Sequence, residues 1–148
     1  MAMVTQLLSA DLQRSQVEKD ATTRTTTPVR ALVAEDFASM QQALVECLQS
    51  IPGLEVVGTA FNGREALEKA RELGPNLAII DLQMPVMNGF ILMRELRKCY
   101  PAILLIAVSG HQSPAIAQEA KGAGANAFVS KSQLPGGLVE TVEKLLSD

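Results

Sequence analysis

The sequence is poor in cysteine, histidine and tryptophan. Its 148 residues include two cysteines, one histidine and no tryptophan. Cys47 and Cys99 are too few for a disulfide framework and lack the spacing of a metal site, so we expect each to be a small buried hydrophobic residue. A single histidine, His111, excludes a zinc site built on histidine and thiolate clusters. We expect His111 to be an exposed loop residue.

The chain also lacks long apolar runs and any large excess of charge. No apolar stretch approaches the roughly 20 residues that a membrane span needs, and the first residues do not have the pattern of a secretion signal. The net charge is -3, with both signs mixed along the chain. Neither a nucleic-acid surface nor a polybasic membrane anchor is predicted. We therefore expect a cytoplasmic protein that contacts neither membrane nor nucleic acid directly.

Residues 1–27 differ from the rest of the chain because they are mostly polar and end in a threonine-rich segment. Some aliphatic residues in this part recur at helical spacing: Val4, Leu7, Leu8 and Leu12. The spacing leaves open a short amphipathic helix, and a flexible tail is the alternative. The length predicts one sizeable domain. We expect an extension and linker at 1–27 and the domain at 28–148.

From Val29 onward, five short apolar runs alternate with stretches of helical period. The runs are Ala31–Ala34, Leu54–Ala60, Leu77–Ile80, Ile103–Val108 and Ala127–Val129. Several are apolar at consecutive positions, which is typical of parallel strands covered by helices on both faces. The alternation predicts an α/β fold of the (βα)5 type, a doubly wound parallel five-stranded sheet.

The stretches between the runs carry the period of amphipathic helices. The expected apolar face of the first comprises Phe37, Met40, Leu44, Cys47 and Leu48. That of the second comprises Ala66, Leu67, Ala70 and Leu73, and Gly74-Pro75 ends this helix. Further helices are predicted at about Gly89–Lys98 and about Pro114–Lys121, and Pro135 suits the first position of the last one.

Polar residues follow four of the predicted strands at their carboxyl ends, where an open α/β sheet binds its ligands. They are Glu35, Asp36, Asp81, Ser109 and Lys131. Four of them have a plainer interpretation when taken alone: a helix N-cap for Asp36, turn chemistry for Asp81 and Ser109, and a solvated loop lysine for Lys131. Because all of them fall at one edge of the sheet, a functional site is the better interpretation.

The chemistry of this group points to phosphoryl transfer. Three carboxylates in a partly buried rim repel one another, and a bound cation relieves this repulsion. Oxygen ligands select a hard ion such as Mg2+. A carboxylate beside Mg2+ can attack a phosphoryl group to give an acyl phosphate. Asp81 would then be the nucleophile, Asp36 and Glu35 would hold the metal, and Lys131 and Ser109 would contact the phosphate oxygens.

The motifs LVAED, AIIDLQMPVMNG, AVSG and AFVSK carry these residues. In order and separation they resemble the receiver domain of two-component response regulators, over about Val29–Ser147. The resemblance implies a flavodoxin-like sheet with strand order 2-1-3-4-5. It also implies that Asp81 takes phosphate from the phosphohistidine of a sensor histidine kinase or a phosphotransfer protein. The metal would be held by Asp36, Asp81 and the backbone carbonyl of Gln83, with Glu35 acting through water.

The resemblance further implies a phosphorylation switch. The hydroxyl of Ser109 is pulled inward, and the aromatic residue Phe128 follows it and remodels a partner surface. Simple core packing is the alternative for Phe128. Family precedent places a surface for a homodimer or an output protein at about 114–146. Lys131 is followed by Ser132 instead of the common proline, which puts the cis peptide bond of the family in doubt.

Three rival functions compete with this interpretation. An aspartyl-phosphate phosphatase needs a second acid two residues after its nucleophile, and Gln83 cannot supply that proton. A flavin carrier needs a small-residue loop after the first strand, where this chain has the acidic EDFASM. A receiver-like module that is never phosphorylated remains a possible alternative.

We expect no enzyme with a separate substrate, although autodephosphorylation at Asp81 is expected. The chain is either stand-alone or the first part of a DNA-binding regulator, whose receivers have a similar VVGTAFNGREALEKA segment.

Overall fold

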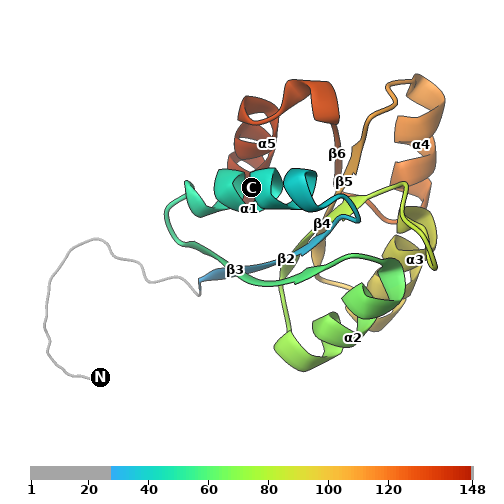
Figure 1. Cartoon of the computed structure of the whole chain (residues 1–148), viewed down its shortest axis with the longest axis horizontal. Helices are drawn as coiled ribbons and strands as arrows, with labels where there is room; N and C mark the ends of the chain where they lie inside the picture. The colour runs from blue at the N-terminus through green and yellow to red at the C-terminus, as the bar shows by residue number, and fades with distance from the viewer. Residues whose placement is uncertain (1–27, 148) are drawn as a thin grey trace, which may run out of the picture.

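The computed structural model describes residues 28–147, so the expectations for residues 1–27 lie outside the described residues. The described part is a parallel sheet with helices on both faces (Figure 1). Its strands are β2 (Val29–Ala34), β3 (Leu54–Ala60), β4 (Leu77–Asp81), β5 (Leu104–Ser109) and β6 (Ala127–Ser130). Its helices are α1 (Ala38–Gln49), α2 (Gly63–Leu73), α3 (Gly89–Cys99), α4 (Pro114–Gly122), the short 3-10 helix η3 (Lys131–Gln133) and α5 (Gly136–Ser147).

The strands lie in the order β3-β2-β4-β5-β6, and every pair is parallel. Counted along the described chain this is 2-1-3-4-5, so the predicted fold class and strand order are confirmed. The chain runs from β2 to β3 on one side and then returns to β4 on the other. The carboxyl ends of β2 and β4 therefore flank the point where an open sheet of this kind forms its ligand crevice.

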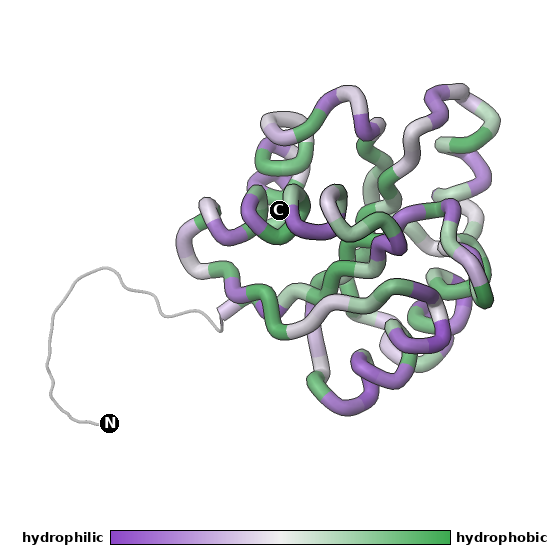
Figure 2. The backbone as a smooth tube through the Cα atoms, viewed as in Figure 1, coloured by the Kyte–Doolittle hydropathy of each residue, from purple (hydrophilic) through white to green (hydrophobic). Residues whose placement is uncertain are grey.

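Two apolar layers hold the helices against the sheet. One contains Leu44 of α1 and Leu138 of α5, and the other contains Ala66 of α2, Leu92 of α3 and Ala120 of α4. All five residues of β4 are buried between these layers. In Figure 2 the apolar colour follows the strands and the inner sides of the helices. Burial on both faces explains why the strands are apolar at consecutive positions.

Local signals set most element boundaries. The predicted end of α2 is confirmed, because Gly74 adopts a left-handed conformation with φ 59° and its N–H bonds the carbonyl of Ala70. Asn88 and Ser113 begin α3 and α4 with side-chain caps. Strand ends lie within two residues of the predicted ones. Pro135 directly precedes α5 instead of being its first residue, and its carbonyl accepts from Val139 N–H.

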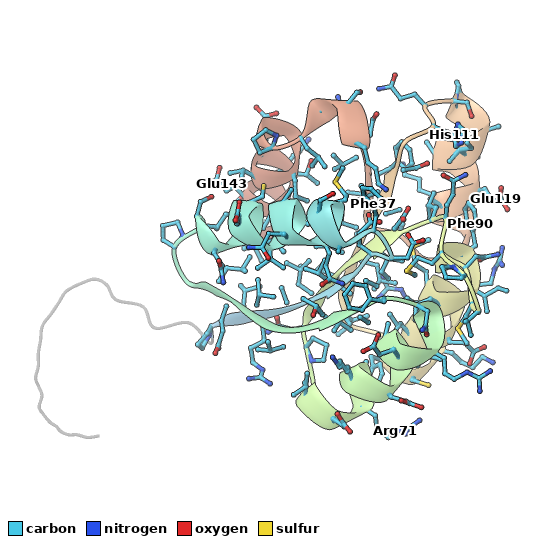
Figure 3. The ribbon with its side chains drawn as sticks, viewed as in Figure 1. Phe37, Arg71, Phe90, His111, Glu119 and Glu143 are labelled. Carbon is cyan, nitrogen blue, oxygen red and sulfur yellow. The ribbon has the colours of Figure 1, made fainter. Side chains whose placement is uncertain are left out.

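Two expectations about burial are wrong. Phe37 precedes α1 and is 66% exposed, because the helix begins one residue after it and the apolar face starts at Met40 (Figure 3). Cys99 is exposed at the end of α3, whereas Cys47 is buried as expected. None of the helices within 28–147 is both long and apolar enough to cross a membrane.

Candidate functional site

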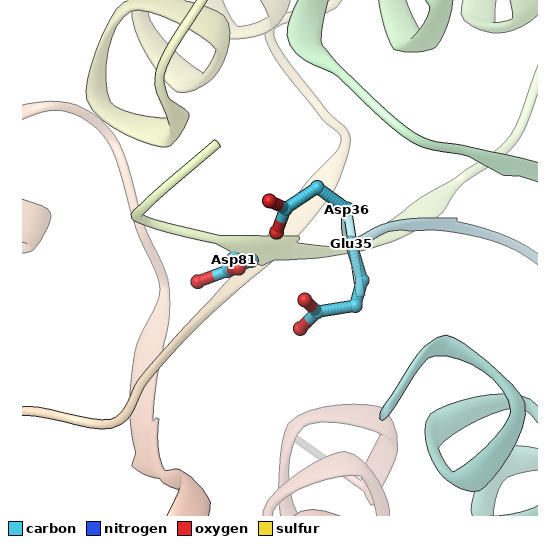
Figure 4. A group of neighbouring side chains, drawn as sticks. All are labelled: Glu35, Asp36 and Asp81. Carbon is cyan, nitrogen blue, oxygen red and sulfur yellow. The ribbon is translucent and has the colours of Figure 1, made fainter. Parts of the chain in front are cut away.

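Three carboxylates meet at the carboxyl edge of the sheet. Glu35 directly follows β2 and is fully buried, Asp36 comes next and is exposed, and Asp81 is the last residue of β4 and 2% exposed. One carboxylate oxygen from each lies within 4.8 Å of those of the other two (Figure 4). The strand register explains this, because Ala34 pairs with Ile80 and the next residue of each strand therefore lies beside its neighbour.

Asp36 does not cap α1. The capping position is Phe37, and no side chain accepts a hydrogen bond there. The plainer interpretation of Asp36 as a helix cap is therefore not what the structure shows. Its carboxylate faces Asp81 instead (Figure 4).

Burial dominates the chemistry of Glu35. Loss of water contact raises the pKa of this carboxyl to about 7, helped by the nearby charge of Asp81 and opposed by Lys131 and by the Phe37 N–H. One oxygen, Oε2, accepts from Phe37 N–H at 3.1 Å. The other, Oε1, has no aligned hydrogen bond among the described residues, although Lys131 Nζ lies 3.0 Å from it as an ion pair.

Lys131 begins η3 and reaches across to both buried carboxylates. Its Nζ is 3.0 Å from Glu35 Oε1 and 3.4 Å from Asp81 Oδ2. Burial alone would lower the pKa of this lysine, but the contacts with Glu35 and Asp81 outweigh it and raise the pKa above its ordinary value. The ammonium is thus held charged against the carboxylate group.

The loop after Asp81 turns back over the strand end. Gln83 N–H donates to Asp81 Oδ1 at 3.0 Å, while the Gln83 side chain is exposed. Val86 has a φ of 69°, and Met87 N–H donates to the carbonyl of Pro85 at 2.7 Å across it. This is a tight γ-turn in a conformation that β-branched residues rarely adopt.

Gly89 lets α3 begin directly against the end of β4. A Cβ at this position would lie 2.4 Å from the backbone oxygen of Asp81 and 2.7 Å from Leu82 Cα. Gly63, at the start of α2, meets the loop in the same way, since its Cβ would lie 2.4 Å from the Met87 oxygen. Both glycines are required by close backbone approach.

Ser109 and Phe128 lie on the two strands that follow the Asp81 strand in the sheet. Ser109 ends β5, is 1% exposed, and its Oγ accepts from His111 N–H at 3.0 Å, so the turn chemistry considered as its plainer interpretation is present. His111 is exposed, as expected. Phe128 pairs with Ala107 in the sheet, is partly buried and packs against the layer under α2, α3 and α4. Phe128 also borders a cleft of about 430 Å³ beside α4.

Three features of the surroundings were not expected. Gln41 is buried and donates to the carbonyls of Glu35 and Ala60. The signal for it was a polar residue at helical spacing with Leu44 and Leu48. The cis peptide bond of the described residues lies at Leu134-Pro135, whereas the bond after Lys131 is not cis, in line with the doubt that Ser132 raises. A cleft of about 950 Å³ runs between α1 and α5, with Cys47 and Val139 in its wall and Lys131 at its border.

The chain is similar to known response regulators in sequence. A family model described as the response regulator receiver domain matches residues 31–143. Chemotaxis protein CheY of Thermotoga maritima is 38% identical over 116 residues, which cover 78% of this chain and 96% of that protein. Protein-glutamate methylesterase/protein-glutamine glutaminase 2 of Koribacter versatilis is 37% identical over 110 residues, covering 73% of this chain and 30% of that protein. The chain thus spans about a third of such larger relatives.

Solved structures agree. The response regulator domain of Thermotoga maritima CheB superposes with a TM-score of 0.74 at 32% identity, covering 82% of this chain and 98% of that one. A two-component response regulator of the LuxR family from Aurantimonas sp. SI85-9A1 gives a TM-score of 0.77 at 29% identity, over 81% and 86%. With the acidic edge, the family match and these neighbours in agreement, the chain belongs to the response regulator receiver domains of two-component signalling systems.

Proposed function

We propose that this receiver domain takes a phosphoryl group onto Asp81 from the phosphohistidine of a sensor histidine kinase or a phosphotransfer protein, and so switches a partner or output surface. The observation that carries the proposal is the environment of Asp81. Its carboxylate is buried at the end of the central strand, with the Lys131 ammonium 3.4 Å away and the Glu35–Asp36 pair beside it. In this environment a carboxylate nucleophile and a bound cation can act together.

The donor set fits Mg2+. Three carboxylates converge within 4.8 Å, and Glu35 Oε1 is a buried oxygen without an aligned hydrogen-bond donor in the described chain. Hard oxygen ligands with room for water suit Mg2+. We propose that Asp36, Asp81 and the Gln83 backbone carbonyl hold the ion, with Glu35 acting through water. When bound, Mg2+ offsets the negative charge of the transferring phosphoryl group.

In the proposed reaction the Asp81 carboxylate attacks phosphorus, the phosphorus–nitrogen bond to the donor histidine breaks, and the imidazole leaves with the bond electrons. An acyl phosphate on Asp81 results. Lys131, held charged beside Asp81 Oδ2, pairs with a phosphate oxygen. Ser109 Oγ already accepts from His111 N–H, so its own proton is free for donation to the phosphate.

The readout proposed for this domain passes from Ser109 to Phe128. Phe128 lies on the strand beside β5 and borders the cleft next to α4, so a shift of Ser109 has an aromatic neighbour with space to move. The responding surface would be about 114–146, used by a homodimer or an output protein. We propose a cytoplasmic signalling domain without a separate substrate, which loses its own phosphate by hydrolysis and does not itself bind nucleic acid or membrane.

Intact-protein mass after incubation with acetyl phosphate and Mg2+ tests the proposal. Wild type should gain one phosphoryl group, and omission of Mg2+ or the Asp81→Asn change should abolish the gain. Glu119→Gln, which neutralises an exposed carboxylate on α4, is the matched control and should label normally. Equal labelling of Asp81→Asn and wild type would refute Asp81 as the acceptor. Absence of labelling from acetyl phosphate and from phosphorylated kinases alike would favour a module that is never phosphorylated.

A further inference from the structure

Gln41 is the one helix residue among the buried polar side chains of residues 28–147. The others, Glu35, Asp81, Ser109 and Ser130, all lie at or next to carboxyl ends of strands. Gln41 lies in the first turns of α1 and is 8% exposed. Its Nε2 donates to the backbone carbonyls of Glu35 and Ala60, each at 3.0 Å. A buried amide that spends both N–H groups on backbone holds that backbone in place.

The two carbonyls belong to the ends of neighbouring strands. Glu35 N–H donates to the carbonyl of Ala60 at 3.0 Å, so β2 and β3 are paired up to this point. Gln41 adds a bond to each of the two carbonyls and ties both strand ends to α1. Beyond Glu35 the chain has only Asp36 and Phe37 before the helix begins. The two hydrogen bonds of Gln41 therefore hold the backbone immediately next to Glu35 and Asp36.

Helix α1 also begins differently from its neighbours. Asn62, Asn88 and Ser113 cap α2, α3 and α4 through their side chains. At α1 the capping position is Phe37, which offers no such bond, and the acid before it faces Asp81. An acidic side chain used as a cap would bond helix N–H groups and turn away from the carboxylate group. Gln41, from within the helix, makes the hydrogen bonds that tie α1 to the loop. The Asp36 side chain is therefore not needed as a cap and can lie beside Asp81.

We propose that Gln41 is a positioning residue of the acceptor site, which fixes the backbone of Glu35 and Asp36 and thereby sets the affinity for Mg2+. The proposal rests on the proposed function of this edge as a metal-dependent phosphoacceptor site. Gln41 touches neither metal nor phosphate. It acts through the carbonyl of Glu35, as hydrogen-bonding partners behind metal ligands do in general.

Gln41→Met tests this because methionine keeps the approximate shape of the side chain and removes the donor. The matched control is Gln42→Met, the same change one residue later, where the side chain is exposed and bonds Glu46. Mg2+ affinity is measured by calorimetry, and hydrogen exchange of the Glu35 amide is measured without metal. We expect Mg2+ binding about tenfold weaker and faster exchange in Gln41→Met, with Asp81 labelling restored at saturating Mg2+. Gln42→Met should match wild type.

Unchanged Mg2+ affinity in folded Gln41→Met would overturn the proposal, and so would an equal loss in Gln42→Met. If Gln41→Met does not fold, Gln41→Asn takes the same measurements, because it keeps an amide but retracts it by one methylene from the two carbonyls. A wild type that neither binds Mg2+ nor labels would refute the proposed function and this role together. A wild type that does both, with Gln41→Met behaving identically, would refute the role of Gln41 alone.

Discussion

Lys131 and Glu35 form an ion pair across the carboxyl edge of the sheet, with 3.0 Å between Nζ and Oε1. The same ammonium lies 3.4 Å from Asp81 Oδ2, so one cation is shared by two buried carboxylates from two different strands. Without a metal ion, Lys131 is the positive charge that offsets their mutual repulsion. A divalent cation at the same group must compete with it.

Lys131→Met should therefore separate metal binding from chemistry. Loss of Lys131 raises the pKa of Glu35 further, so the comparison is made well above pH 7, where Glu35 is ionised. There we expect Mg2+ to bind several-fold more tightly, since the competing ammonium is gone. Labelling of Asp81 at saturating Mg2+ should nevertheless be slower, because the ammonium proposed to pair with a phosphate oxygen is gone. Calorimetry measures the Mg2+ affinity, and intact-protein mass over time measures the rate of Asp81 labelling. Lys121→Met removes an exposed lysine at the end of α4 and serves as the control. Weaker Mg2+ binding in Lys131→Met would contradict the competition.

Glu35→Gln should change how stability depends on pH. The folded-state pKa of Glu35 is about 7 against an ordinary 4.5. The folded state therefore holds this proton more tightly, and the associated stability is present below about pH 4.5 and lost as pH rises to about 7. That shift corresponds to at most about 3 kcal/mol. The amide introduced by this change cannot ionise, so Glu35→Gln should gain about 1–3 kcal/mol over wild type above pH 7 and nothing at low pH.

Urea unfolding without divalent ions measures the Glu35 effect across the pH range. Glu119→Gln removes an exposed charge and should follow wild type throughout. A stability difference that stays constant with pH would assign the gain to packing and not to ionisation.

Gly89→Ala should destabilise the fold and disturb the proposed acceptor site at Asp81. The new Cβ would meet the Asp81 backbone oxygen at 2.4 Å, and backbone cannot move aside as a flexible side chain does. We expect a loss of about 2–3 kcal/mol in urea unfolding and slower Asp81 labelling. Gly136→Ala, at the start of α5 with nothing within 4 Å, is the control and should be neutral or slightly stabilising. Equal stability of the two variants would refute the close-approach argument.

Val86→Gly should stabilise the loop after Asp81. Valine at a φ of 69° is strained, and glycine adopts this conformation freely. The larger freedom of glycine in the unfolded chain offsets part of the gain. We expect a net increase of about 0.5–1 kcal/mol in the free energy of unfolding. A loss of stability in Val86→Gly would show that the side chain, 71% exposed here, contributes contacts that outweigh the strain.

Hydrophobic patterning predicted the sheet because every strand except the edges is covered on both faces, and such strands read as unbroken apolar runs. The edge of the sheet that carries the acidic group was also predictable. Parallel strands all end at the same side, so residues placed after successive runs are brought together by topology alone. Glu35, Asp36, Asp81 and Lys131 meet for this reason.

The features that the sequence analysis missed depend on helix boundaries and long-range contacts, which hydrophobic periodicity does not report. Phe37 has the spacing of the apolar face but falls one residue before the first helical turn, and an offset of one residue moves a side chain from core to solvent. Cys99 lies three residues after buried Leu96, at helical spacing, but it is the last residue of α3 and is exposed. The role of Gln41 depends on the meeting of β2, β3 and α1, a long-range arrangement that local sequence patterns do not report.

The cleft between α1 and α5 contains a cysteine that can be labelled selectively. Cys47 lies in its wall with Sγ 3.2 Å from the Pro135 carbonyl, and burial raises the pKa of this thiol. We therefore expect thiol reagents to react faster with exposed Cys99 than with Cys47. Because Lys131 borders the same cleft, a small fluorophore on Cys47, with Cys99 replaced by serine, would lie in the same cleft as the lysine that contacts Asp81. The two cysteines thus make the native sequence a starting point for an optical sensor of the proposed acceptor site.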